Sequence, residues 1–467
     1  MMNRTKVIFF TLSSAGVYRN LFFFPESVFN KLKNLVGTRE DIKIVLLAYD
    51  AYYDKFVSNF SGIKNKNFVI EKETIPAKKT KLQKIFYFFY SYLIYTKTTE
   101  MLATMGLRPD EPPAGGKTYL APIKKLIANT FGRSRFFKLR VIPTIYYILF
   151  PERPFSKIIE KYNPDLIFLP HIYGQFDTML LAEARRRNIK TIGMAAGWDH
   201  LDKYFLPFQS DKFLAQSEHV WEMAIKYQGY KDKQISVIGY PHLDFVSNPR
   251  YALPRRDFLK NMDFPEDAKF LLYISGSAYC PDEPDVIETI LKWTEEGRLG
   301  ENMNLIIRPY LGGRGADRDF DKKKFEKFEE NPRVRFWKRE AWDDLPNSIN
   351  FMNIMRHSSV IISIFTTAVL EAAVFDVPLV TTVFDGYNKR PYNRSIRRFL
   401  MSEHFKDVLD TKAIKITNNF DELFEAIDSY LKNPKIDARE REVLRNKLLY
   451  KLDGNASNRI IEYFIGS

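Results

Sequence analysis

The 467-residue sequence has a single cysteine and no long apolar run. The lone Cys280 excludes an internal disulfide framework and any all-cysteine metal site, and it fits a reducing compartment best. The longest apolar candidate, residues 85–95, is too short and too polar for the ~20 residues of a membrane span. The N-terminal run at residues 7–10 is also too short for a signal peptide, so we expect it to be the first strand of a domain.

Several ligand-binding motifs are missing as well. The sequence has no cysteine pair and no His-Glu-x-x-His, so no metal and no metal cofactor are predicted. It contains no complete Gly-x-Gly-x-x-Gly and no Walker lysine motif, which argues against NAD-dependent and ATP-dependent enzymes. What remains is a chain with 45% hydrophobic and 27% charged residues, whose length predicts two α/β domains.

The formal net charge of +14 is concentrated in one segment. Residues 78–153 contain 14 Lys and Arg but only 4 Asp and Glu, and aromatic residues are interleaved with them. This mixture suits an anionic membrane surface, where rings lie at headgroup level and each cation adds about 1 kcal/mol. Two alternatives are a helical insertion with inward aromatics and solvated cations, and a nucleic-acid surface, although no nucleic-acid-binding motif is present. A Pro/Gly-rich loop at residues 108–116 interrupts the segment.

Elsewhere, short apolar runs alternate with helical patterns, which predicts a parallel sheet in each half. The expected strands of the first half are residues 6–12, 42–48, 67–71, 166–169, 191–194, 211–215 and 235–238. Those of the second half are residues 270–274, 304–308, 334–336, 360–364 and 379–383, followed by helices from Asp421 onward. A glycine-rich loop at residues 311–315 follows one of these strands.

The expected organisation is two Rossmann-like domains facing across a cleft. Residues 1–245 form an acceptor domain with the helical insertion at about 78–154, residues 246–267 a linker, and residues 268–452 a donor domain. A final helix in residues 453–467 is expected to pack back on the first domain.

Loops at the carboxyl ends of parallel strands are where such sheets bind ligands. In the second half, Thr366 and Thr367 stand between a strand and a helix, where hydroxyls and helix N-terminal amides suit a phosphate. Glu371, one turn later, is placed to accept hydrogen bonds from a ribose or sugar, although a capping threonine and a solvated glutamate explain the same pattern equally well. Ser275, Gly276 and Ser277 offer a diphosphate loop, and Arg308 could neutralise a departing phosphate.

In the first half, the strand-end candidates on the acceptor side are Ser14, Gly16, Arg19, His200 and His242. For a sugar hydroxyl nucleophile, His171 or Asp199 could take the proton.

Four motifs together resemble a known family. They are Gly197-Trp198-Asp199-His200-Leu201, the segment at 237–244 with its Gly239 and Asp244, the 357–385 strand–helix–strand unit, and Lys451–Ile460. The second half resembles the nucleotide-sugar domain of GT-B glycosyltransferases, and residues 165–467 look like bacterial surface-polysaccharide enzymes near the CDP-glycerol glycerophosphotransferases. The resemblance implies a metal-independent transferase with donor contacts at Ser277, Thr366, Thr367 and Glu371.

The sequence departs from that family at Arg308-Pro309, where the glycerophosphotransferases carry His-Pro. A permanent cation replaces an imidazole there, which favours charge neutralisation over proton transfer and a sugar donor over glycerophosphate. The predicted function is a glycosyltransferase of surface-glycan synthesis, peripheral on the cytoplasmic membrane face, with a lipid-linked or oligosaccharide acceptor. A glycerophosphotransferase, a UDP-sugar 2-epimerase and a non-catalytic glycan-assembly scaffold are the alternatives.

Overall fold

The computed structural model describes residues 5–56, 60, 63, 65–106, 118–310, 316–337 and 344–466, so the loops at 108–116 and 311–315 lie outside the described residues. The chain divides into two compact units. Unit 1 comprises Met1–Thr99, Leu120–Ser247 and Leu449–Ser467; unit 2 comprises Glu100–Tyr119 and Asn248–Leu448. The segment expected as an insertion is thus shared, because Glu100–Tyr119 groups with unit 2.

Unit 1 is built on a seven-stranded sheet in the order β3-β2-β1-β4-β5-β6-β7, and every pair of neighbours is parallel. The strands are β1 (Lys6–Leu12), β2 (Ile42–Tyr49), β3 (Phe68–Glu73), β4 (Leu166–Leu169), β5 (Lys190–Met194), β6 (Lys212–Ala215) and β7 (Ile235–Val237). All seven expected strands are confirmed to within a few residues. They form because apolar runs can be buried on both faces of a parallel sheet.

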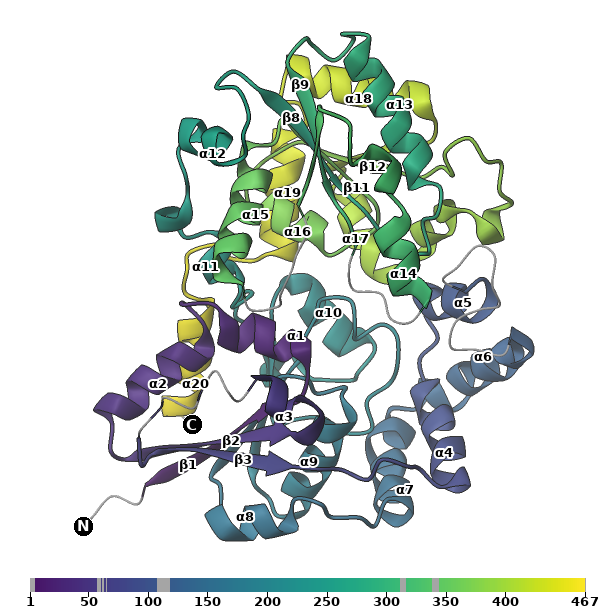
Figure 1. Ribbon diagram of the computed structural model, residues 1–467. Helices are drawn as coiled ribbons and strands as arrows, with labels where there is room; N and C mark the ends of the chain where they lie inside the picture. The colour runs from purple at the N-terminus through teal and green to yellow at the C-terminus, as the bar shows by residue number, and fades with distance from the viewer. Residues whose placement is uncertain are drawn as a thin grey trace. The chain divides into compact units, whose positions relative to one another are not determined.

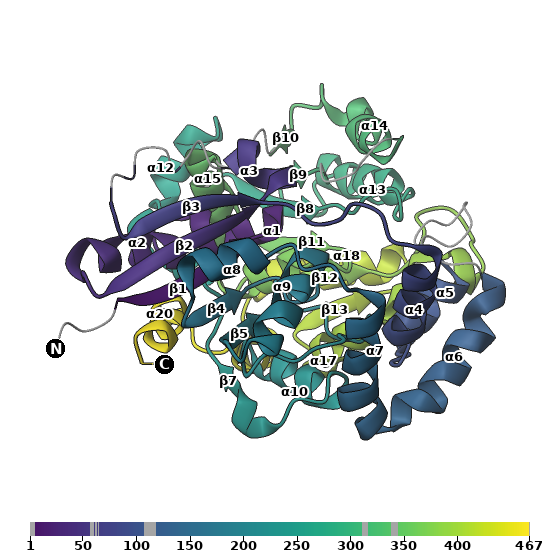
Figure 2. The ribbon, with the colours of Figure 1, turned by 90° about the horizontal axis from the view of Figure 1, so that it is seen from below.

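Helices cover both faces of this sheet. They are α1 (Ala15–Tyr18), α2 (Val28–Thr38), α3 (Asp50–Phe56), α8 (Ser156–Tyr162), α9 (Gln175–Arg186), α10 (Glu218–Lys226), α11 (Leu243–Val246) and α20 (Ala456–Gly466). Alternate residues of β1 face opposite sides: Phe10 packs on Phe464 of α20, whereas Phe9 contacts Tyr162 of α8. Figure 2 shows α8 and α9 in front of the sheet.

The C-terminal helix α20 is part of unit 1. Its first amides, those of Ala456 and Ser457, donate to the buried carboxylate of Asp244 at 3.0 and 2.7 Å. At its other end, the Lys6 ammonium donates to the carbonyl of Phe464 at 2.7 Å. The helix lies beside α2 (Figure 1). Its N-terminal amides are therefore hydrogen-bonded, and its apolar face is packed, within unit 1.

The connection from β3 to β4 is helical: α4 (Lys81–Ser91), α5 (Lys97–Thr104), α6 (Ala121–Asn129) and α7 (Ile142–Leu149). Helix α4 begins with a capping box between Thr80 and Gln83, and the Gln83 amide also donates to the Leu149 carbonyl at the end of α7 at 2.9 Å. The two helices lie side by side (Figure 1). Thr98 anchors the start of α5 by donating to the buried Asp202 carboxylate at 2.7 Å.

Unit 2 contains a parallel six-stranded sheet in the order β10-β9-β8-β11-β12-β13. Its strands are β8 (Lys269–Ile274), β9 (Met303–Arg308), β10 (Val334–Phe336), β11 (Val360–Ser363), β12 (Leu379–Thr382) and β13 (Ile414–Thr417). Its helices are α12 (Arg255–Asn261), α13 (Glu283–Glu295), α14 (Ala316–Lys323), α15 (Leu345–His357), α16 (Ala368–Ala373), α17 (Glu403–Asp410), α18 (Phe420–Lys432) and α19 (Ala438–Leu448). The sequence analysis missed β13, α14, α15 and α17, and it missed α12, which lies in the segment expected to be the linker.

Among the described residues, no helix combines the length and the apolar character needed to cross a membrane.

Candidate functional site

In unit 1, three of the predicted loops leave neighbouring strands. Strands β1, β4 and β5 are adjacent and parallel, so the loops that follow them emerge at one edge of the sheet. The loop after β1 carries Ser13, whose hydroxyl lies 3.5 Å from Nδ1 of His171 in the loop after β4. The loop after β5 carries Asp199 and His200. The fold therefore brings together residues that are up to 187 positions apart in the sequence, and one of them, Ser13, was not among the candidates.

Tyr173 connects the two histidines. Its ring stands edge-on to His171 and is stacked on His200, with centroid distances of 4.3 Å in each case. Its hydroxyl is 3.2 Å from Nε2 of His200. On the far side of His200, the Asp199 carboxylate lies 3.7 Å from Nδ1 and accepts a hydrogen bond from the Lys203 ammonium at 2.6 Å. The result is one continuous cluster, His171, Tyr173, His200, Asp199 and Lys203.

Burial sets the charge of this cluster. Desolvation, with a smaller contribution from His200, lowers the pKa of His171 to about 4. Desolvation also lowers the pKa of His200, although Asp199 acts against it. Burial alone would lower the pKa of Lys203, but the adjacent Asp199 outweighs it and holds that pKa above its ordinary value. Near neutral pH the two imidazoles are therefore neutral, and the ammonium and carboxylate form an ion pair.

A buried carboxyl holds the loop after β4 in place. Asp177 in the first turn of α9 has no exposed surface, and its Oδ2 accepts the amide N–H of His171 at 2.8 Å. Burial raises the pKa of Asp177 to about 6, although that amide and the hydroxyls of Ser13 and Thr11 act in the opposite direction. Asp177 therefore fixes the backbone of His171 through this hydrogen bond.

Two glycines let the histidine rings lie close to the backbone. A Cβ on Gly174 would stand 2.7 Å from Nδ1 of His171, and one on Gly197 would stand 2.6 Å from Cε1 of His200. Any side chain at either position would displace an imidazole. These glycines are thus part of the architecture of the cluster.

A cavity of about 290 Å³ opens beside the cluster, and it is lined by unit 1 residues alone. Tyr173, His200 and Lys203 form one side of it. The other side comes from the helical connection and the 204–207 segment, through the aromatic rings of Tyr87, Tyr90, Tyr146, Phe150, Tyr204 and Phe205. The sequence analysis singled out the aromatic segment and the strand-end histidines separately, and the structure shows that rings of that segment and His200 line this one cavity.

The remaining acceptor-side candidates are placed differently. The Ser14 hydroxyl accepts the amide N–H of Val17 at 3.2 Å and so caps α1. Gly16 is exposed in that short helix, and Arg19 follows it. His242 follows β7 at the edge of the sheet, where its ring stands edge-on to Tyr240 at 5.8 Å. Because β5 and β6 separate β7 from β4, His242 does not belong to the His171 cluster.

In unit 2 the predicted donor residues also leave neighbouring strands. Strands β9, β8 and β11 are adjacent, with Arg308 paired to Ile274 and Ile274 to Ser363 in register. Arg308, the 275–277 loop and Thr366 consequently lie at consecutive strand ends, as expected for a ligand-binding edge of a parallel sheet.

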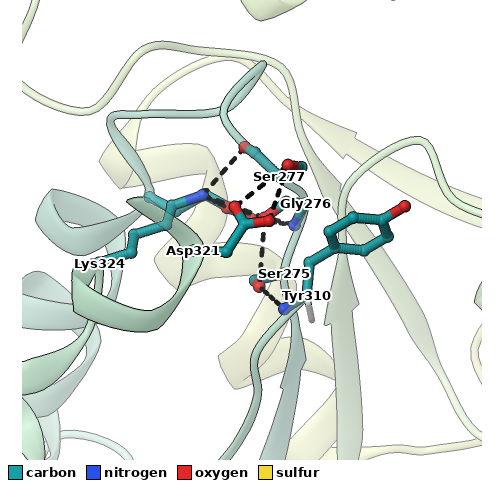
Figure 3. Close-up of polar contacts among 7 residues, drawn as sticks. Ser275, Gly276, Ser277, Tyr310, Asp321 and Lys324 are labelled. Atoms are coloured by element: carbon teal, nitrogen blue, oxygen red, sulfur yellow. Dashed lines mark hydrogen bonds and ion pairs between the residues drawn. The ribbon is translucent and has the colours of Figure 1, made fainter. Parts of the chain in front are cut away.

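The 275–277 loop is held by charged groups from inside the unit (Figure 3). The amide of Gly276 donates to both carboxylate oxygens of Glu283, at 3.1 and 3.2 Å. The Lys324 ammonium donates to the carbonyls of Gly276 and Ser277, at 3.1 and 3.3 Å, and forms a buried ion pair with Glu283. The amide predicted to meet a phosphate is thus engaged by a carboxylate of the protein itself.

The two serines of this loop are also bonded within the unit. The Ser277 hydroxyl donates to Asp321, with its two oxygens at 3.1 and 2.9 Å, and Ser275 accepts the amide N–H of Tyr310 at 2.9 Å (Figure 3). Asp321 ends the Asp-x-Asp triplet at 319–321, which overlaps a second triplet at 317–319; the expectation of a metal-free site assumed that this motif is absent, which is wrong. Among the residues that the structure describes, no group of three or more His, Cys, Asp and Glu side chains is placed to hold a metal ion.

Arg308 and the 366–371 segment complete this edge. The Arg308 guanidinium lies over the rings of Phe351 and Trp337, 5.3 and 5.8 Å from their centroids, which fixes its direction by cation–π contact. The Thr366 hydroxyl accepts the amide N–H of Ala368 at 3.2 Å at the start of the six-residue helix α16. Thr367 precedes that helix, and Glu371 within it is buried.

Sequence reasoning missed Tyr173, Lys203, Glu283, Asp321 and Lys324. Tyr173 and Lys203 lie within three residues of predicted candidates, so the strand-end signal could have included them. Lys324 closes the run Lys322-Lys323-Lys324, which is typical of a solvated surface, yet it alone of the three is buried. Only the packing of α14 onto the 275–277 loop distinguishes it.

No protein-family model and no curated protein matches this sequence. Solved structures do. The UDP-GlcNAc 2-epimerase of Neisseria meningitidis, bound to UDP-GlcNAc, is 13% identical with a TM-score of 0.53, and the match covers 99% of this chain and 100% of that one. The UDP-GlcNAc 2-epimerase of Methanocaldococcus jannaschii is 14% identical with a TM-score of 0.52, over 99% and 100%. A glycosyltransferase from Rickettsia africae ESF-5 is 11% identical with a TM-score of 0.50, over 99% of both chains.

These matches run along the whole chain and agree with its two parallel sheets of seven and six strands. The chain has the GT-B fold, built from two Rossmann-like domains, which confirms the fold class that the sequence motifs indicated.

Proposed function

We propose that the protein is a glycosyltransferase that moves a sugar from a nucleotide-sugar donor to a glycan acceptor. The cavity beside His171 and His200 carries this proposal, because a transferase needs a place for a second substrate whereas an isomerase does not. Support for the donor comes from the Neisseria structure of the same fold, which is bound to UDP-GlcNAc. The donor is assigned to the strand-end loops of unit 2 and the acceptor to unit 1.

In the proposed reaction an acceptor hydroxyl oxygen bonds to the anomeric carbon, the bond from that carbon to the phosphate oxygen breaks, and the nucleotide leaves. We assign the proton of the hydroxyl to His171, because its imidazole is neutral near pH 7, whereas Asp199 is ion-paired to Lys203. The negative charge on the leaving phosphate is assigned to Arg308 and the Thr366–Thr367 turn. Glu371 and the 275–277 loop are proposed to contact the donor.

Arg308 also motivates the proposal that the reaction needs no metal, since a guanidinium can balance the charge of a leaving phosphate. The test is a transfer assay with and without EDTA. Unchanged turnover is the expected result, and loss of turnover that returns with Mg²⁺ or Mn²⁺ would contradict it.

The second candidate is a UDP-sugar 2-epimerase, which the two epimerases of the same fold favour. The two reactions differ in what they require. A transferase releases free nucleotide only when an acceptor is present, whereas an epimerase converts its nucleotide sugar to an isomer without one.

The deciding experiment incubates the protein with UDP-, GDP- and CDP-sugars, with and without oligosaccharide acceptors, and follows the products by NMR. Acceptor-dependent release of nucleotide supports the transferase, a new sugar isomer supports the epimerase, and release of CMP with glycerophosphate transfer would indicate a glycerophosphotransferase. Absence of any turnover would favour a binding scaffold. His171→Ala and Arg308→Ala should each lower transfer at least tenfold, and Lys33→Gln, an exposed change on α2, is the control.

We also propose that helices α4, α6 and α7 dock on the cytoplasmic face of an anionic membrane, where a lipid-linked acceptor is presented. Their exposed apolar residues include Leu82, Ile85, Ile123, Leu126 and Ile148, which are between 47 and 70% exposed. Lys81, Lys84 and Lys125 are exposed on the same helices, so apolar contact and charge attraction would act together.

Vesicle co-sedimentation tests this docking with phosphatidylcholine alone and with added phosphatidylglycerol. Binding should need the anionic lipid and weaken with salt. The double variant Leu82→Ser/Ile85→Ser should bind about tenfold more weakly, whereas Val443→Ser, 47% exposed on α19 of unit 2, should bind as the unaltered protein does. Equal binding of all three proteins would remove these helices from the proposal.

A further inference from the structure

The cavity in unit 1 has a one-sided charge distribution. Lys79 and Lys203 line it, and among its described lining residues there is no Asp or Glu. Lys203 is ion-paired to Asp199, which is not among the lining residues, whereas the Lys79 ammonium lies over the ring of Tyr87, 4.0 Å from its centroid. Burial lowers the pKa of Lys79, so its ammonium is partly desolvated and gains from an anionic partner inside the cavity.

The rest of the wall combines flat aromatic faces with hydroxyl groups. Tyr90, Tyr146 and Phe150 are buried, and their rings come from the adjacent helices α4 and α7. The side chains of Ser91, Thr178 and Tyr173 add hydroxyls from three different elements. Aromatic rings pack well on the C–H faces of pyranoses, and hydroxyls exchange hydrogen bonds with their O–H groups, so this lining suits a sugar better than a lipid tail.

The volume limits what can enter. At about 290 Å³ the cavity lies at the lower end of ligand pockets, which span roughly 300–1,000 Å³. It therefore has room for one sugar ring with its substituents and not for a long oligosaccharide, whose remaining residues would extend outside.

We propose that this cavity binds an acidic sugar, a pyranose carrying a carboxylate or a phosphate, as the acceptor residue, with its anionic group at Lys79 and Lys203. This inference rests on the proposed transferase function. It specifies the class of acceptor. It also gives the helical connection a role in substrate selection, because the cavity is lined by residues in or next to that connection: Lys79, Tyr87, Tyr90 and Tyr146.

The test is a ligand-observed NMR titration of the full chain with glucuronate, glucose 1-phosphate and glucose. The acidic sugars should bind at least about tenfold more tightly than glucose, and added salt should reduce the difference. Preference for glucuronate or for glucose 1-phosphate identifies the carboxylate or the phosphate as the natural group. Equal binding of all three sugars, or tighter binding of glucose, would overturn the proposal.

Variants locate the site. Lys79→Met keeps the apolar stem but removes the charge, and Gln175→Glu places a carboxylate on the wall at an exposed position that tolerates it. Both should weaken binding of the acidic sugars about tenfold and leave glucose binding unchanged. Lys33→Met is the matched control, because Lys33 is exposed on α2 and does not line the cavity. Undiminished binding in the two cavity variants would overturn the assignment.

Transfer assays separate this inference from the function on which it rests. If neutral acceptors are used and acidic sugars do not bind, the transferase proposal stands and the acidic-sugar assignment fails. If the acidic sugars bind through Lys79 but no nucleotide sugar is turned over in their presence, the cavity assignment stands as a binding site and the transferase proposal fails.

Discussion

The strand-end loops of the two units use ionisable side chains in opposite ways. In unit 1, His200 and Lys203 retain 29 and 24% of their side-chain exposure and line a cavity. In unit 2, the side chains of Lys324 and Glu283 are only 1 and 4% exposed and are bonded to the backbone of the 275–277 loop. The edge in unit 1 has partly exposed ionisable side chains that line a cavity, whereas the edge in unit 2 uses buried charges to fix its loop.

This difference indicates a division of labour within one fold. A loop that must meet a nucleotide sugar in a fixed geometry benefits from a rigid backbone, and a buried ion pair with several hydrogen bonds supplies it. An acceptor cavity lined by partly exposed ionisable side chains depends instead on the protonation states of those groups. Substitutions at the edge of unit 2 should therefore mainly lower stability, whereas substitutions at the edge of unit 1 should change how stability depends on pH.

The largest expected effect comes from breaking the buried pair of unit 2. Lys324→Met leaves the Glu283 carboxylate buried without its partner, so we expect the free energy of unfolding to fall by about 3–5 kcal/mol. Lys323→Met, at an exposed neighbour, should change it by less than about 0.5 kcal/mol. Urea denaturation of both variants measures these changes in the free energy of unfolding. A cost below 1 kcal/mol for Lys324→Met would mean that the pair does not hold the loop.

The next effect is specific to unit 1 and depends on pH. Burial raises the pKa of Asp177 from 3.8 to about 6, so the native state binds this proton more readily than the unfolded chain does. Its contribution to stability is fully present below pH 3.8 and is lost as the pH rises through 6, by roughly 3 kcal/mol. Asp177→Asn can still accept the His171 amide, so it should be more stable than the unaltered protein at pH 7 and similar to it near pH 4.

His171 shifts stability in the other direction. Its pKa is lowered from 6.5 to about 4, so its contribution is present above pH 6.5 and is lost as the pH falls towards 4. Between pH 4 and 6 the contributions of the two groups to the free energy of unfolding therefore partly cancel. Plotted against pH over this range, the free energy of unfolding should rise for Asp177→Asn and fall for His171→Gln. Parallel slopes would contradict the burial of one of them.

A smaller effect should follow from filling the space beside His171. Gly174 has an ordinary extended backbone with φ −71°, so Gly174→Ala is disfavoured only by its contact with the imidazole. We expect a loss of about 1–3 kcal/mol, together with reduced transfer. Gly37→Ala, inside α2 with nothing within 4 Å, should instead gain about 0.5–1 kcal/mol. Thermal denaturation distinguishes the two, and a gain at both positions would show that the ring moves aside without cost.

The fold could be predicted further than the site. Apolar runs such as Ile42–Tyr49 and Val360–Ser363 predict buried parallel strands, and the carboxyl ends of these strands indicate where ligands bind. Strand β13 was missed because its four residues alternate, with Lys415 exposed, and only pairing with β12 makes it a strand. The cavity could not be predicted, since it needs α4 and α7 to lie beside the loops after β4 and β5, which no local pattern encodes.

The smallest effect compares two hydroxyls that were both predicted to bind ligands and that both accept a backbone N–H at the start of a helix. Ser14 accepts an amide in unit 1 and Thr366 accepts one in unit 2, each at 3.2 Å. As caps, Ser14→Ala and Thr366→Ala should each cost about 1 kcal/mol of stability. If Thr366 also contacts the donor, its variant should bind UDP-GlcNAc more weakly by a larger factor than the stability loss explains, whereas Ser14→Ala should leave that affinity unchanged. Calorimetric titration beside urea denaturation measures both quantities. Equal UDP-GlcNAc affinities in both variants would assign Thr366 to capping alone and move the donor contacts to Arg308 and Glu371.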